Sequence, residues 1–148
     1  MEIRPVQPAD KEEWLRFRIA LWPDTDSQKE AQEISDFFAG LPIEDLGAAF
    51  VCSRPEGGLC GLVEVSIHTS APGCETDRIG YLEAWYVDPV VRNQGIGRAL
   101  VAQAEQWARG KGCLEMASDT TPFYPVSPAA HAALGYEEVE RNFRKALD

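Results

Sequence analysis

A turn of the form Arg-x-x-Gly-x-Gly, from Arg92 to Gly97, constrains this chain more than any other stretch. An apolar and aromatic run ending at Asp88-Pro89 precedes the turn, and a segment with apolar residues at helical spacing follows it. The turn therefore joins a strand to a helix. The first backbone N–H groups of a helix have no helical partners and carry the positive end of its dipole, so they suit a phosphate or pyrophosphate. A turn whose glycines serve only close packing would have the same sequence.

Length and composition indicate one domain. The chain has 148 residues, of which 45% are hydrophobic and 26% charged, and we expect residues 1–148 to fold around one core. No apolar run reaches the length of a membrane span, and the first residues are unlike a signal peptide, so we expect a cytoplasmic protein without a membrane partner. The four cysteines form no CxxC pair, which favours free thiols over disulfides or zinc ligands.

The chain is strongly acidic, with a formal net charge of −10. This balance argues against nucleic acid as a partner, because phosphates need a basic face, and it leaves room for a cationic partner. Seven carboxylates lie between Asp24 and Asp45 against a single lysine. They form either a solvated helix face or an acidic lip over a site.

Hydrophobic periodicity and turn residues predict alternating strands and helices. The predicted strands are residues 2–7, 48–53, 59–68, 79–87, 114–118 and a last one from 136 onward, and the predicted helices are residues 10–21, 27–40, 95–110 and 129–134. The last strand rests on the alternation of Val139, Arg141 and Phe143 with polar residues. The order β-α-α-β-β-β-α-β-α-β describes one layered α/β domain with a mixed sheet.

This order and four motifs resemble the fold of the GNAT acetyltransferases. The motifs are Leu82 to Pro89, Arg92 to Arg98, Ala117-Ser118-Asp119, and His131 to Tyr136. The resemblance covers the whole chain and implies a mixed central β-sheet flanked by helices, with acetyl-CoA as co-substrate and no metal. Leu21-Trp22, Leu82 to Val87, Ala117 to Asp119 and Glu140 are similar to the aminoglycoside 6'-N-acetyltransferases. That similarity implies an aminoglycoside acceptor, antibiotic resistance and a homodimer.

The resemblance implies that acetyl-CoA lies between the fourth and fifth strands, which splay apart beyond a bulge. The backbones of Trp85, Tyr86 and Val87 would pair with the pantetheine arm like an added strand, a role that coexists with core packing of their side chains. Backbone N–H groups, with two arginines, would hold the pyrophosphate along Arg92, Asn93, Gln94, Gly95, Ile96, Gly97 and Arg98. Arg92 is alternatively a solvated cap. Tyr124, in the loop before the last helix, is a further CoA contact or a proton donor.

The resemblance assigns the acceptor to Glu83, Asp119, Trp22 and Glu140. Glu83 lies in an apolar strand, where a carboxylate is costly unless it is paired or faces a cleft, and Asp119 ends the fifth strand. Both would contact ammonium groups of the substrate, and one would remove the amine proton directly or through water, unless they only position the ammonium. Trp22 would form a wall, or belong to the core. Glu140 would contribute from the C-terminal strand, in its own or a partner subunit, or be an ordinary exposed charge.

The general acid is left open. GNAT proteins often have a Tyr four residues before the Gly of Leu-Gly-Tyr, and this chain has His131 there. His131 can protonate the leaving thiolate; alternatively the thiolate needs no protein acid and His131 is a packed helical residue. No Ser-His-Asp order or reactive cysteine setting is present, which favours direct attack of the 6'-amine on the thioester in a ternary complex.

Two other readings of the function remain open. The first is a GNAT acetyltransferase acting on a polyamine, another small amine or a protein amino group, for which an acidic site is equally suitable. The second is a GNAT-like module that binds acetyl-CoA without catalysis or merely dimerises. Glu83 and Asp119 argue against the second, because a pure CoA binder has no need of carboxylates at the acceptor side.

Overall fold

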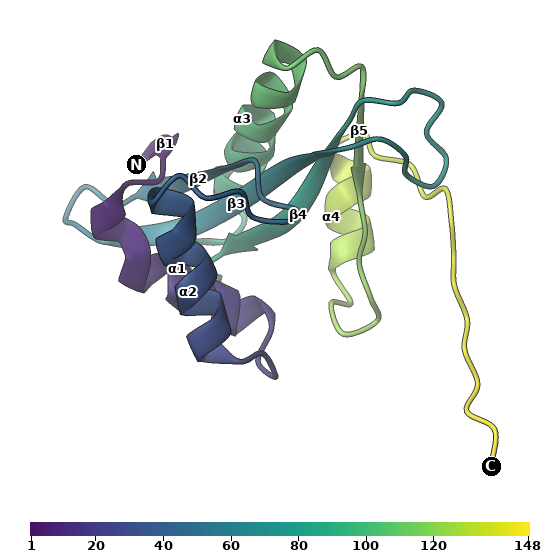
Figure 1. The fold of residues 1–148 in the computed structure, drawn as a ribbon, viewed down its shortest axis with the longest axis horizontal. Helices are drawn as coiled ribbons and strands as arrows, with labels where there is room; N and C mark the ends of the chain where they lie inside the picture. The colour runs from purple at the N-terminus through teal and green to yellow at the C-terminus, as the bar shows by residue number, and fades with distance from the viewer.

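A computed structural model describes residues 1–148, and a five-stranded mixed sheet forms its centre (Figure 1). The strands lie in the order β1-β2-β3-β4-β5, with antiparallel pairing from β1 to β4 and parallel pairing between β4 and β5. Their bounds are β1 Glu2–Pro5, β2 Ala48–Ser53, β3 Leu59–His68, β4 Ile79–Val87 and β5 Glu115–Ser118. β1 is an edge strand, as its proline predicts, because proline cannot donate to a second neighbour.

Helices cover both faces of the sheet (Figure 1). They are η1 Pro8–Asp10, α1 Lys11–Leu21, α2 Ser27–Phe38, η2 Pro89–Val91, α3 Ile96–Gly110 and α4 Ser127–Ala133. Side chains alternate across β3, so Leu62 packs in the core under α1 and α2 while Val63 and Val65 pack in the core under α3. None of these helices has both the length and the apolar character needed to span a lipid bilayer.

The elements follow the predicted order as far as α4. The last predicted strand is wrong for the single chain, because residues 137–148 form neither strand nor helix and run away from the body as an extended segment (Figure 1). Val139, Phe143 and Leu147 on this segment are 52%, 88% and 86% exposed. Alternation with a period of two marks a segment that is extended, but a strand also needs a neighbour to pair with.

A β-bulge lies in the middle of β4. Glu64 of β3 is paired with Ala84, and the next residue, Val65, is paired with Leu82, so Glu83 is the extra residue. A bulge bends the strand and redirects the side chain of the extra residue. Glu83 therefore sits where β4 turns away from β5.

All four cysteines are free thiols, as their spacing predicts. Cys113 is buried just before β5. Burial raises the pKa of the Cys60 thiol to about 12, so this cysteine stays protonated and unreactive.

Candidate active site

A cleft of about 1210 Å³ opens where β4 and β5 part. β5 pairs with β4 only as far as the pair Leu82 and Ser118, whereas β4 continues to Val87. Beyond that pair, no strand occupies the edge of β4 that faces β5, so its backbone borders the cleft. The loop between α1 and α2 forms one wall, and α4 with the loop before it forms another. An open α/β sheet binds ligands in such a crevice at the ends of diverging strands.

Free backbone N–H groups line one end of the cleft, around the Arg92–Gly97 turn. None of the six N–H groups of residues 93–98 donates a hydrogen bond to a protein acceptor. Asn93 and Gly95 have positive φ angles of 63° and 84°, which turn the chain sharply into α3. Six unsatisfied donors at the N-terminus of a 15-residue helix are suited to binding an anion.

The two glycines of this turn have different roles. Gly95 adopts a left-handed conformation, and a Cβ atom there would meet no other atom within 4 Å. At Gly97 a Cβ atom would lie 3.3 Å from the indole of Trp85, whose Nε1 donates to the Gly97 carbonyl at 3.2 Å. Gly95 therefore shapes the turn, while Gly97 allows close packing against Trp85.

Arg92 and Arg98 add positive charge at this end. The Nε of Arg92 donates to the carbonyl of Val87 at 2.7 Å, and its guanidinium lies 5.6 Å from the centre of the Tyr86 ring. Arg98 donates to the carbonyl of Ala133 on α4 at 3.2 Å. Both side chains line the cleft, whereas the exposed side chain of Gln94 does not.

Carboxylates line the opposite end. Glu83 accepts hydrogen bonds from the hydroxyl of Ser66 and from Nε2 of His68, the latter at 2.7 Å. Burial raises the pKa of Glu83, and these two hydrogen bonds only partly offset that effect. Asp119 follows β5 and accepts a hydrogen bond from the hydroxyl of Tyr81. Burial, followed by this hydrogen bond, raises the pKa of Tyr81, so its hydroxyl remains a donor.

The carboxylates of this end have no Lys or Arg partner. Asp24, Glu83 and Asp119 line the cleft, and none of them forms an ion pair with a basic side chain other than histidine. The four buried carboxylates elsewhere, by contrast, are all paired with arginine: Asp10, Glu30, Glu64 and Asp88. The negative charge at this end of the cleft is therefore uncompensated and attracts a cation.

The wall between α1 and α2 is held by a buried network. Arg18 is 4% exposed and donates to both oxygens of Glu64 and to Glu30. Glu30 in turn accepts from the hydroxyl of Thr25 at 2.7 Å, and Thr25 lines the cleft. Trp22, which ends α1, lines the cleft beside it. Trp22 is therefore part of the wall rather than the core.

Tyr124 closes the cleft on this side. Its hydroxyl donates to the carbonyl of Leu21 at the end of α1, so the loop before α4 is tied to the opposite wall. Burial raises the pKa of Tyr124, which keeps the hydroxyl protonated. In this arrangement the Tyr124 hydroxyl proton is donated to the Leu21 carbonyl and is not directed at a leaving group.

His131 lies on α4 with both ring nitrogens engaged. Nδ1 lies 2.8 Å from the carbonyl of Ser127, which can only accept, so Nδ1 carries a proton. Nε2 lies 2.8 Å from the hydroxyl of Ser118 and, in the neutral ring, accepts from it. The ring also packs edge-on against Trp85. A neutral His131 thus has no proton to give to a leaving group, and an acid role requires the imidazolium.

Glu140 is not brought to the cleft within one chain. It lies in the exposed segment after α4, where its carboxylate accepts from the amide of Asn142 at 3.3 Å. The remaining predicted residues, apart from Gln94, line the cleft together.

Four polar residues that hydrogen-bond Glu83, Asp119 or His131 were not predicted as site residues: Ser66, His68, Tyr81 and Ser118. Glu64, Ser66 and His68 occupy alternate positions of the apolar strand β3. Polar residues at every second position of such a strand indicate that one of its faces has polar partners. Which residues they meet depends on the register with β4, which the sequence does not reveal.

Comparison with known proteins identifies the family. A model of the acetyltransferase (GNAT) family matches residues 11–136. The chain belongs to the GNAT acetyltransferase family. Among GNAT proteins, an aminoglycoside N(6')-acetyltransferase type 1 of Klebsiella aerogenes is 43% identical over 147 residues, covering 98% of this chain and 96% of that protein. One of Stenotrophomonas maltophilia is 39% identical, covering 99% and 94%.

Solved structures of GNAT enzymes agree with this relationship. AAC(6')-Iy in complex with the bisubstrate analog CoA-S-monomethyl-acetylneamine has a TM-score of 0.85 and 30% identity, covering 99% of this chain and 97% of that one. AAC(6')-IG from Acinetobacter haemolyticus has a TM-score of 0.84 and 32% identity, covering 100% of both chains. The GNAT fold and the similarity to aminoglycoside 6'-N-acetyltransferases inferred from the motifs are therefore confirmed.

Proposed function

We propose that this GNAT enzyme transfers the acetyl group of acetyl-CoA to the 6'-amine of aminoglycoside antibiotics and thereby confers resistance to them. The separation of positive and negative groups along the cleft is the observation that supports the proposal. Free N–H groups and two arginines lie at one end, and carboxylates without basic partners lie at the other. A pyrophosphate and a polycationic amino sugar have complementary charges, so each matches one end.

The donor binds along β4. The six N–H groups of residues 93–98 hold the pyrophosphate, and Arg92 and Arg98 lie beside it. The pantetheine arm runs along the open edge of β4 at Trp85, Tyr86 and Val87 and takes the place of a missing strand. This path leads from the turn toward the bulge, so it brings the thioester close to Glu83.

The acceptor amine attacks the thioester carbon directly. The nitrogen lone pair forms the new C–N bond, the C–S bond breaks, and CoA leaves as a thiolate. Holding both reactants in one cleft supplies most of the rate, because two separate molecules then react as one. Asp119, Asp24 and the wall at Trp22 hold the other ammonium groups and rings of the substrate.

Glu83 is the base that takes the amine proton. Its carboxylate oxygen is fixed by Ser66 and His68, and burial raises its pKa toward the range in which a carboxylate accepts a proton readily. The thiolate is protonated from solvent or by the imidazolium of His131, which reaches the cleft through the Ser118 hydroxyl.

The enzyme acts as a homodimer in this proposal. The segment after α4 is extended, and its apolar residues Val139, Phe143 and Leu147 are 52%, 88% and 86% exposed within one chain. The outer edge of β5 has no partner strand within the chain. Exchange of the C-terminal segments covers these apolar side chains and carries Glu140 toward the cleft of the partner. Free thiols and the use of acetyl-CoA suit the cytoplasm.

Expression in a susceptible bacterium tests the function. We expect the chain to raise the inhibitory concentrations of kanamycin and tobramycin, and a Glu83→Gln variant produced at the same level to lose most of that protection. No protection by the parent chain, together with no acetylation of any aminoglycoside in vitro, would rule the proposal out. Turnover of a polyamine or a protein amino group under those conditions would favour the alternative acceptors.

A further inference from the structure

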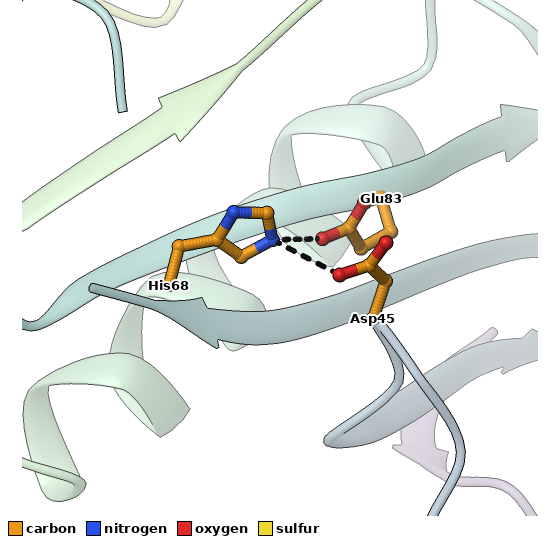
Figure 2. Close-up of side chains that lie close together, drawn as sticks. All are labelled: Asp45, His68 and Glu83. Atoms are coloured by element: carbon orange, nitrogen blue, oxygen red, sulfur yellow. Dashed lines mark hydrogen bonds and ion pairs between the residues drawn. The ribbon is translucent and has the colours of Figure 1, made fainter. Parts of the chain in front are cut away.

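The side chains of Asp45, His68 and Glu83 lie close together (Figure 2). Glu83 also lines the cleft. Asp45 belongs to the loop between α2 and β2, His68 is the last residue of β3, and Glu83 is the bulge residue of β4. Nε2 of His68 lies 2.7 Å from Glu83 and 3.5 Å from Asp45 (Figure 2). One nitrogen and two oxygens thus converge from three separate segments.

The cluster carries more negative than positive charge. Asp45 and Glu83 have His68 as their only basic partner, and Asp119 is linked to the same group through Tyr81. In the free protein Nε2 of His68 donates its proton to Glu83, so an ammonium group competes with His68 for the carboxylates. A metal ion displaces this proton to solvent and then contacts the nitrogen and both carboxylates.

The surroundings hold the ligands in place. The His68 ring stacks on Tyr81 at 4.2 Å with an interplanar angle of 14°, which fixes the direction of Nε2. The hydroxyl of Ser66 donates to Glu83, so this carboxylate is oriented from outside the cluster. In metal sites, residues that hydrogen-bond or pack against the ligands commonly orient them in this way.

We propose that Asp45, His68 and Glu83 bind a divalent transition metal ion of the Zn²⁺ class, which blocks the acceptor end of the cleft. Zinc binds imidazole nitrogen and carboxylate oxygen at about 2.0–2.2 Å, so tetrahedral ligand atoms lie about 3.4 Å apart. The three atoms lie within 4.8 Å of one another, and the Asp45 side chain is 57% exposed and free to close the remaining gap. An imidazole ligand favours zinc over magnesium or calcium.

A bound ion occupies Glu83 and neutralises the charge of Glu83 and Asp45, so it excludes a cationic acceptor. It leaves the turn at residues 93–98 untouched, so acetyl-CoA binding is unaffected. Metal binding stands independently of the acceptor, whereas competition with an aminoglycoside rests on the proposed function.

Titration of the chelator-treated protein with ZnCl₂ in a calorimeter tests the site. We expect saturable 1:1 binding that weakens at least about 10-fold in His68→Asn and in Asp45→Asn, because loss of even an outer partner of a metal ligand costs about 10–100-fold. Asp45→Asn lies on an exposed loop and keeps the fold. Two controls retain full affinity: His131→Asn, the other histidine, and Cys74→Ser, the half-buried thiol.

No saturable binding, equal affinity in His68→Asn and the parent, or loss of binding in Cys74→Ser would each overturn the site. Inhibition is then measured with neomycin as acceptor. Zn²⁺ should raise the apparent KM for neomycin and leave that for acetyl-CoA unchanged, and Asp45→Asn should need at least about 10-fold more Zn²⁺. Equal inhibition of both proteins would mean that zinc acts on the substrates and would overturn the blocking role. No turnover with intact zinc binding would refute the proposed function alone.

Discussion

Replacing Arg18 with methionine should lower the free energy of unfolding by about 3–5 kcal/mol, the usual cost of removing one partner of a buried ion pair. Glu64 is 2% exposed and takes two hydrogen bonds from Arg18, at 2.8 and 2.7 Å, and Glu30 takes a third at 2.7 Å. After the substitution, Glu64 keeps only the indole N–H of Trp14 and Glu30 only the hydroxyl of Thr25. Two buried carboxylates then lack a cation.

Urea unfolding followed by circular dichroism measures the loss. A domain of this size has a stability of about 5–15 kcal/mol, so the shift in midpoint should be large. Replacing Arg18, Glu30 and Glu64 together with methionine should recover most of the loss, because an apolar set of similar volume needs no desolvation of charge. Since Glu30 holds Thr25 at the cleft, the single variant should also raise the KM for the acceptor more than that for acetyl-CoA.

A loss below about 1 kcal/mol in Arg18→Met would refute this reasoning, because it would mean that the two carboxylates are solvated rather than buried. A triple variant less stable than the single variant would refute it as well. The conservative Arg18→Lys variant should fall between parent and methionine, because an ammonium group cannot bond both oxygens of Glu64 as the planar guanidinium does.

Three further predictions concern the cleft. Asp119→Asn should lower kcat/KM for the aminoglycoside about 10–100-fold by removing a charged contact, while calorimetry shows unchanged acetyl-CoA affinity; unchanged turnover would mean that Asp119 is only a surface residue. Gly97→Trp should weaken acetyl-CoA binding at least about 10-fold, which corresponds to about 1.4 kcal/mol, because its side chain meets the indole of Trp85. Normal binding would contradict the placement of the pyrophosphate. Burial raises the pKa of Glu83, and the base must be ionised, so kcat/KM should fall as the pH decreases through a pKa above the ordinary 4.5, and this acid limb should disappear in Glu83→Gln.

The parts of the fold that sequence predicts well are those set by local pattern. The helix after Gly95 and the strand ending at Val87 were placed by periodicity and by the turn between them. The C-terminal segment shows the limit of this reasoning. Alternation of Val139 and Phe143 with polar residues is the same for a paired strand and for an exposed extended tail, and only a neighbouring strand decides between them.

The residues of the site can likewise be divided into those that the sequence predicts and those that depend on strand pairing. The Arg92–Gly97 turn could be assigned because its chemistry lies in one continuous stretch. Glu83 could be singled out as a carboxylate in an apolar strand, but the bulge that redirects it is a property of the β3–β4 register. His68 and Tyr81 could not be predicted as site residues. The partner of His68 depends on that register, and the partner of Tyr81 depends on where the chain leaves β5 at Asp119.

Acetyl transfer to a matched pair of aminoglycosides tests the central claim most directly. Neomycin and paromomycin differ only at the 6' position, which carries an amine in neomycin and a hydroxyl in paromomycin. The proposed function predicts that the purified enzyme releases CoA with neomycin and adds one acetyl group, found by mass spectrometry and NMR at the 6'-nitrogen, and that paromomycin is not acetylated. Equal rates with the two compounds, or acetylation of neomycin at another amine, would contradict it.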